Sequence, residues 1–127
     1  MMKLINFSHP LTSEQLAQIT DIIKTTVSVV AEINPQFDVE QAFAPQVADL
    51  LDSLNIQTPA WQLETWLIVL PALNTIASVL LAELHARMGH FPSIVRLCPT
   101  HHNFSTHYIV AEIVDLERVR QNARMRR

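Results

Sequence analysis

The stretch Trp66-Leu67-Ile68-Val69-Leu70 decides the fold class, because it is a continuous apolar run of strand length. Such a run is typical of a central strand that is covered on both faces, as in a parallel sheet. Pro71 ends this strand, and Asn74 or Thr75 is expected to cap a long helix after it. Gly89 stands just past that helix, where a left-handed residue often ends helices. A buried strand followed by a long helix indicates an α/β protein.

The sequence on either side of this unit also alternates between strands and helices. We expect a strand over residues 1–7, a helix that Thr12 caps together with Gln15, a Val- and Thr-rich strand over residues 25–33, and a helix within residues 39–54 with Pro45 in its first turn. Downstream we expect strands over residues 92–97 and 107–113, and a last helix from Asp115 or Leu116 onward.

This order predicts a single α/β domain over residues 1–127. Because strands and helices alternate, the sheet should be open and mostly parallel, with four or five strands and helices on both faces. The fourth and fifth strands have no helix between them and should form an antiparallel β-hairpin at the C-terminal edge.

Composition and charge exclude several classes of protein. The chain has 127 residues, 49% of them apolar and only one of them Gly, which is a globular composition. No apolar run approaches the roughly 20 residues needed to span a bilayer, and the start does not read as a secretory signal. The lone Cys98 cannot form a disulfide within the chain, so a reducing, cytoplasmic setting is expected.

Five of the nine basic residues lie in the last ten positions, and the first 117 residues hold all twelve acidic residues. A body with this balance lacks the basic face that duplex nucleic acid requires. The arginine-rich end either contacts phosphate or is a solvated helix end.

The candidate ligand site follows from a rule for open α/β sheets: ligands bind beyond the carboxyl ends of the strands. Three segments meet this condition. They contain Asn6, Ser8 and His9 after the first strand, Pro71, Asn74 and Thr75 after the third, and residues 98–103 after the fourth.

The chemistry of these segments suits an anionic ligand. Ser8 and His9 offer a hydroxyl and an imidazole, and His9 is the candidate catalytic acid or base. The N-terminus of the helix at Asn74 and Thr75 suits phosphate, although both residues also fit ordinary capping. Arg96 lies inside an apolar strand, where it binds either a phosphate or the carboxylate of Glu112.

Two classes of bound group are not expected. His101, His102 and His107 do not complete a metal-ligand pattern, so no metal site is expected. With a single glycine the chain has neither a dinucleotide fingerprint nor a Walker loop, so no cofactor is expected.

Four stretches of the sequence resemble a known family. They are residues 2–12 (MKLINFSHPLT), residues 69–73 (VLPAL), residues 80–96 (LLAELHARMGHFPSIVR) and residues 111–116 (AEIVDL). These stretches are spread along the whole chain. In them the sequence is similar to the Csx-fifteen family, a small CRISPR-associated group from type III systems.

The resemblance implies a minimal CARF-like, Rossmann-like domain that binds cyclic oligoadenylate, most simply cyclic tetraadenylate. It also implies a homodimer or higher homo-oligomer with the ligand between subunits, because a twofold axis suits a symmetric ring. Three functions stay open: sequestration of the signal, its cleavage by a metal-independent ring nuclease with His9 as the catalytic group, and a purely structural role.

Overall fold

The computed structural model describes residues 1–102 and 104–127, with only the backbone at position 102. Its sheet has five strands in the order β2-β1-β3-β4-β5. Neighbouring strands run parallel except for the antiparallel pair β4 and β5. The strands are β1 (Met2–Asn6), β2 (Val27–Glu32), β3 (Trp66–Val69), β4 (Ser93–His102) and β5 (Ser105–Asp115). The helices are α1 (Ser13–Ile23), α2 (Phe43–Ser53), α3 (Thr58–Leu63), α4 (Asn74–Met88) and α5 (Leu116–Met125).

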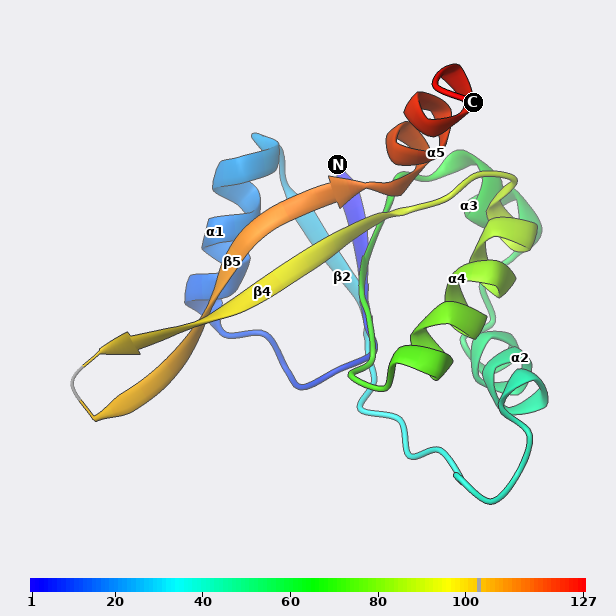
Figure 1. Cartoon of the computed structure of the whole chain (residues 1–127), viewed down its shortest axis with the longest axis horizontal. Coiled ribbons are helices and arrows are strands. Elements are labelled where there is room, and N and C mark those ends of the chain that lie inside the picture. The colour runs from blue at the N-terminus through cyan, green and yellow to red at the C-terminus, as the bar shows by residue number, and fades with distance from the viewer. Residues whose placement is uncertain (103) are drawn as a thin grey trace.

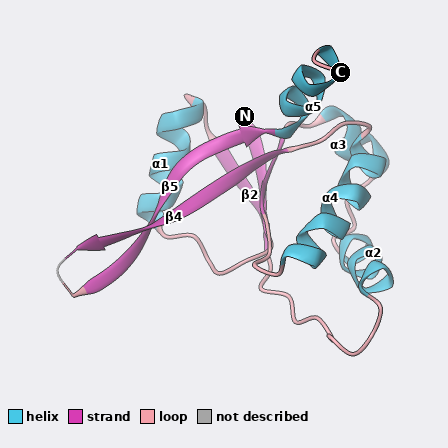
Figure 2. Cartoon of the chain, viewed as in Figure 1, coloured by secondary structure: helices cyan, strands magenta, loops and turns pink. Residues whose placement is uncertain are grey.

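Helices cover both faces of this sheet, as expected (Figures 1 and 2). Alternate side chains of one strand point to opposite faces, so Leu4 packs with Ile19 of α1 on one side. Its neighbour Ile5 packs on the other side with the cluster that α2, α3 and α4 supply. All four residues of β3 are buried, which matches a central strand. The predicted Rossmann-like α/β architecture is therefore confirmed.

The layer formed by α2, α3 and α4 contains the larger of the two cores. Arg87 of α4 joins α2 to this layer through an ion pair with Asp52 (2.8 Å), and it also pairs with Glu83 (3.1 Å). The short helix α3 was not predicted, because six residues with a Pro near the start carry too little periodicity. It contributes the buried Trp61, whose ring lies 5.1 Å from that of Trp66.

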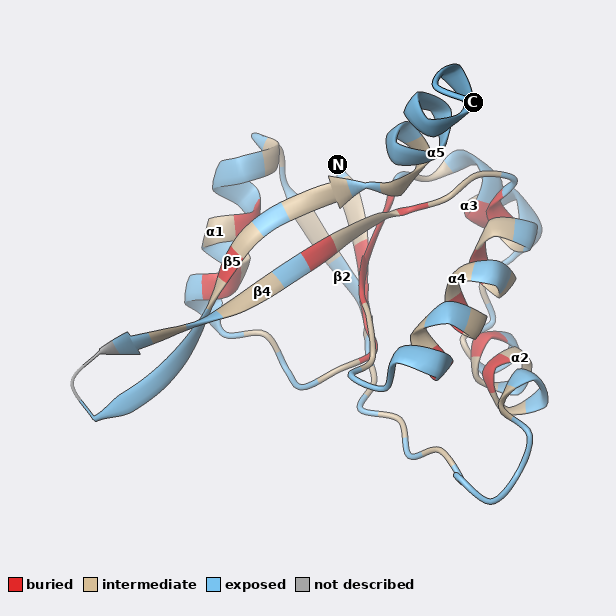
Figure 3. Ribbon diagram, viewed as in Figure 1, coloured by how far each residue is buried: buried red, intermediate tan, exposed pale blue. Residues whose placement is uncertain are grey.

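The β4–β5 hairpin is longer than the sequence indicates. We expected strands over 92–97 and 107–113, whereas pairing continues to His102 opposite Ser105. Residues 98–102 therefore belong to β4, and the prediction that they form a loop at a strand end is wrong. Asn103 lies outside the described residues. The hairpin extends beyond the body of the molecule (Figure 1), and residues 104–108 are exposed (Figure 3).

Most predicted helix ends are confirmed. Thr12 and Gln15 form the expected capping box, and Gly89 ends α4 with a φ of +83°. The helix expected within residues 39–54 begins at Phe43, so Pro45 lies in its first turn. Asp115 is the N-cap of α5. None of the helices in the described part of the chain is long and apolar enough to cross a bilayer.

Candidate functional site

A hollow of about 610 Å³ lies at the carboxyl ends of the strands. The loop between β1 and α1 supplies most of its lining, including Ser8 and His9. Ala72 comes from the loop after β3, while Leu97 and Tyr108 come from the two strands of the hairpin. Two of the predicted strand-end loops thus meet at one hollow, and its volume lies within the usual range for small-molecule sites.

The buried side chain of Asn6 holds the first of these loops in place. Its Oδ1 accepts a hydrogen bond from the backbone N–H of Ser8 (2.9 Å), and its Nδ2 donates to the carbonyl of His9 (2.8 Å). Asn6 is fully buried, so its amide lies beneath the loop while Ser8 and His9 line the hollow. Asn6 therefore positions the two candidate residues, and a direct contact between it and a ligand stays a prediction.

Glu32, the last residue of β2, fixes the same loop from the neighbouring strand. Its Oε1 accepts from the backbone N–H of Leu11 (2.9 Å) and lies 3.4 Å from Asn6 Nδ2. The backbone N–H of Phe7 donates to the carbonyl of Val69 on β3 (2.9 Å). The loop is thus tied to both strands that flank β1, which leaves its backbone little freedom.

Among the described residues that line the hollow there is no Asp, Glu, Lys or Arg. The lining combines the hydroxyls of Ser8 and Thr12 with apolar groups such as Leu97 and with the ring of Tyr108. Among the described residues, neither the Ser8 hydroxyl nor the His9 ring has a hydrogen-bond partner, so both can serve a ligand. Hydroxyls and an imidazole suit a phosphate or a ribose, and the apolar wall with its aromatic ring suits a base.

The N-terminus of α4 differs from what the sequence indicates. The helix begins at Asn74, and its N-cap is Leu73, which offers no side-chain acceptor. The prediction that Asn74 or Thr75 caps the helix is therefore wrong; instead the Thr75 hydroxyl donates to Asn74 Oδ1 (3.3 Å). Asn74, Thr75 and Pro71 lie in or beside the loop that supplies Ala72, but they do not line the hollow. Their contact with a ligand stays a prediction.

Arg96 forms the predicted ion pair. Its Nε lies 2.7 Å from Glu112 Oε2 across the hairpin, and both side chains are about half exposed. Neither residue lines the hollow, and the half-exposed guanidinium reaches both solvent and its carboxylate partner. Binding of a phosphate by Arg96 stays a prediction.

The histidines of the hairpin bond to neighbouring hydroxyls. His101 Nδ1 lies 3.2 Å from the Thr106 hydroxyl, and His107 Nε2 lies 2.9 Å from the Ser105 hydroxyl. Among the residues that the structure describes, no group of three His, Cys, Asp or Glu side chains is placed to hold a metal ion. Both described imidazoles therefore form hydrogen bonds within the hairpin.

Five residues that line the hollow were not found from the sequence as ligand contacts: Leu11, Thr12, Gln15, Leu97 and Tyr108. Gln15 was expected only as part of the cap of α1, yet its Nε2 also donates to the carbonyl of Tyr108 (2.8 Å). This contact joins residues 93 positions apart. No local pattern signals it, because it depends on how α1 packs against β5.

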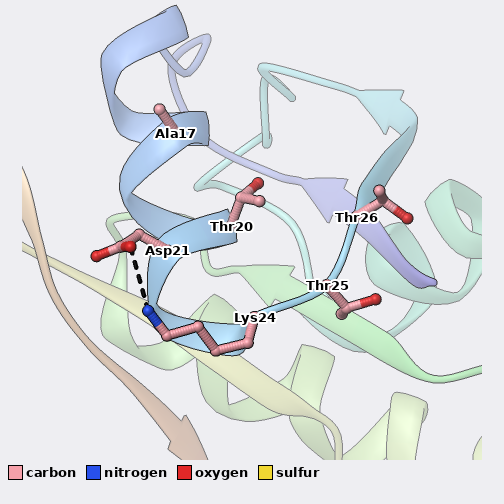
Figure 4. A pocket seen from close by; sticks show the side chains of 6 residues that line it. All are labelled: Ala17, Thr20, Asp21, Lys24, Thr25 and Thr26. Carbon is pink, nitrogen blue, oxygen red and sulfur yellow. Dashed lines mark hydrogen bonds and ion pairs between the residues drawn. The ribbon is translucent and has the colours of Figure 1, made fainter.

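Another hollow, of about 590 Å³, lies at the opposite edge of the sheet (Figure 4). The C-terminal half of α1 and the turn before β2 form it, with Thr20, Thr25 and Thr26 among its lining. Lys24 and Asp21 form an ion pair of 3.2 Å there, but both side chains are more than three-quarters exposed. This hollow lies at the amino ends of the strands, away from the predicted site. Substitutions in it can therefore serve as controls for substitutions in the predicted site.

No family model, curated protein or solved structure matches the chain.

Proposed function

We propose that this protein binds a cyclic oligoadenylate, with cyclic tetraadenylate as the expected ligand, and lowers its free concentration by sequestration. The observation that carries the proposal is the hollow at the carboxyl ends of β1 and β3, where the side chains of Ser8 and His9 have no hydrogen-bond partner among the described residues. The resemblance of the sequence to the Csx-fifteen family names the ligand class. A homodimer with the ring between two such hollows fits a symmetric ligand.

The lining favours binding over rapid catalysis. Cleavage of the ring by its own ribose 2′-hydroxyl needs a base, an acid and a group that stabilises the charge developing on phosphate. His9 is the one imidazole in the hollow, and no Lys or Arg is among its lining residues. A metal-independent ring nuclease with His9 as the catalytic group is the second candidate function, and it predicts slow turnover.

The first experiment mixes the protein, in molar excess and without metal, with labelled cyclic tetraadenylate. A native gel reports retention, and chromatography over an hour reports whether the ring stays intact. Retention of an intact ring is the expected result. Linear products would establish the ring nuclease instead, and absence of retention at micromolar protein would contradict the proposal and favour a structural role.

Variants test whether the hollow is the binding site. Ser8→Ala and His9→Ala should each weaken retention by about 5-fold to 100-fold, because each removes a polar contact that the ligand uses. The matched controls lie at the other edge of the sheet: Thr26→Ala in the hollow of Figure 4, and His90→Ala next to Phe91. Equal loss in the controls would place the effect outside the hollow.

A further inference from the structure

A further hollow, of about 520 Å³, adjoins the candidate site on the side of the β-hairpin. It is distinct from the hollow in Figure 4. We call it the second hollow, because it is the second of the two that meet at Tyr108. The two hollows share Thr12, Gln15 and Tyr108. On its far side, the second hollow is lined by Glu14 of α1 and by Thr100, Thr106 and His107 of the hairpin. Tyr108 therefore stands at the boundary, in contact with both spaces.

The backbone beneath Tyr108 is held rigidly by α1. Gln15 Nε2 donates to the carbonyl of Tyr108 (2.8 Å), and Gln15 Oε1 accepts from the backbone N–H of Thr12 (2.9 Å). Two residues further along β5, the N–H of Val110 donates to Gln18 Oε1 (2.9 Å). Two glutamine side chains of α1 thus satisfy backbone groups of β5, which fixes the Tyr108 backbone against the body.

The side chain of Tyr108 remains free on this rigid base. It is 56% exposed, and its hydroxyl has no hydrogen-bond partner among the described residues. An exposed aromatic side chain on an anchored backbone is a good platform for a nucleobase, since stacking needs no particular base sequence.

The rest of the second hollow also suits a base better than a phosphate. Residues 97–111 contain no Asp, Glu, Lys or Arg, and the one charged residue in the lining is the acidic Glu14. A phosphate would meet this carboxylate without a compensating cation in the lining. The exocyclic amine of an adenine would instead find acceptors in Glu14 and in the hydroxyls of Thr100 and Thr106.

We propose that the second hollow receives an adenine base stacked on Tyr108, so that one subunit holds two neighbouring nucleotides of the ring. This proposal rests on the proposed function. Two adjoining hollows in each of two subunits related by a twofold axis present four nucleotide positions, the number that the proposed cyclic tetraadenylate ring contains.

The test uses the fact that Tyr108 is the only tyrosine of the chain. Protein with labelled tyrosine gives NMR signals from one ring, and a base stacked on that ring moves them upfield through its ring current. We expect this shift on addition of cyclic tetraadenylate. Tyr108→Ala should weaken binding by about 5-fold to 150-fold, whereas Tyr108→Phe should bind within about threefold of the wild type, because it keeps the aromatic face.

The outcomes separate this proposal from the function on which it rests. Binding by the wild type with no tyrosine shift, or with Tyr108→Ala equal to the wild type, would overturn the second base site and leave the proposed function intact. No binding by the wild type would overturn both. Unchanged thermal melting of Tyr108→Ala without ligand shows that the variant is folded, and the NMR measurement on the wild type decides the matter if it is not.

Discussion

The loops that follow β1 and β3 occupy equivalent places in the fold, yet they are held very differently. Both lie at the carboxyl end of a central parallel strand, and both lead into a helix. The loop after β1 is tied down by Asn6, by Glu32 and by the capping box of Thr12. The loop after β3 ends at Leu73, an N-cap without a side-chain hydrogen bond.

The difference teaches that position in the fold and rigidity are separate properties. Topology brings both loops to one edge of the sheet, but only the first loop has polar side chains beneath it that fix its backbone. Ser8 and His9 are therefore presented in a defined geometry, which a binding site needs. Asn74 and Thr75 are exposed at a helix end that lacks a cap.

The largest expected effect comes from removing the buried amide under the first loop. Asn6→Ala leaves the backbone groups of Ser8 and His9 without their partner, so the free energy of unfolding should fall by about 1–3 kcal/mol. The same change in the second loop, Asn74→Ala, should alter it by less than about 0.5 kcal/mol, because Asn74 is exposed. Urea denaturation measures both values.

Ligand binding sharpens this first prediction. Asn6→Ala should also weaken retention of cyclic tetraadenylate, because the loop that carries Ser8 and His9 loses two of the hydrogen bonds that hold it. A stability loss in Asn74→Ala equal to that in Asn6→Ala would contradict the contrast between the loops.

The same contrast explains how far the sequence could predict the site. The rule about strand ends placed Ser8 and His9 at the end of β1, where they line the hollow, because β1 and its end are marked by apolar residues and by Pro10. The anchoring by Glu32, the bond from Gln15 to β5 and the place of Tyr108 in the lining were missed, since each joins segments far apart in the chain. The fold class was predictable, because each element carries its own periodicity.

Two errors have local causes. Asn74 and Thr75 both have good capping side chains, but α4 starts one residue before the sequence signal, so Leu73 takes the N-cap position. The hairpin was predicted too short because its outer part is polar and lacks apolar alternation. Its pairing is visible only in the register, with Thr100 opposite His107.

A smaller effect is expected from exchanging the caps of the two helices. Thr12→Ala removes the side-chain acceptor at the start of α1 and should lower the free energy of unfolding by about 1 kcal/mol. Leu73→Asp gives α4 the acceptor that it lacks, and should raise that free energy by about 0.5–1 kcal/mol, since Leu73 is 46% exposed and loses little packing. Thermal and urea melts of both variants measure the changes.

The controls for this exchange are variants that keep or supply a side-chain acceptor at the N-cap. Thr12→Ser keeps the hydroxyl and should stay within about 0.5 kcal/mol of the wild type, and Leu73→Asn supplies an acceptor without a charge. Destabilisation by both Leu73→Asp and Leu73→Asn would show that the start of α4 is held by contacts of the leucine side chain instead.

The smallest effect is expected at α5, a third helix start, which lies at the other edge of the sheet. The pKa of Glu117 in its first turn is lowered, chiefly because its carboxylate accepts a hydrogen bond from the backbone N–H of Phe91 (3.2 Å), and Arg120 adds to the shift. A lowered pKa in the folded state means that the carboxylate stabilises the fold fully above the ordinary pKa of glutamate, about 4.3. This contribution is lost as the pH falls through the lowered pKa of Glu117.

Thermal melts of the wild type and Glu117→Gln between pH 7 and pH 3 should therefore differ most at pH 7 and converge toward pH 3. The difference should be slight because the carboxylate is solvent-screened. Curves that stay parallel over this range would show that Glu117 acts through contacts other than its charge.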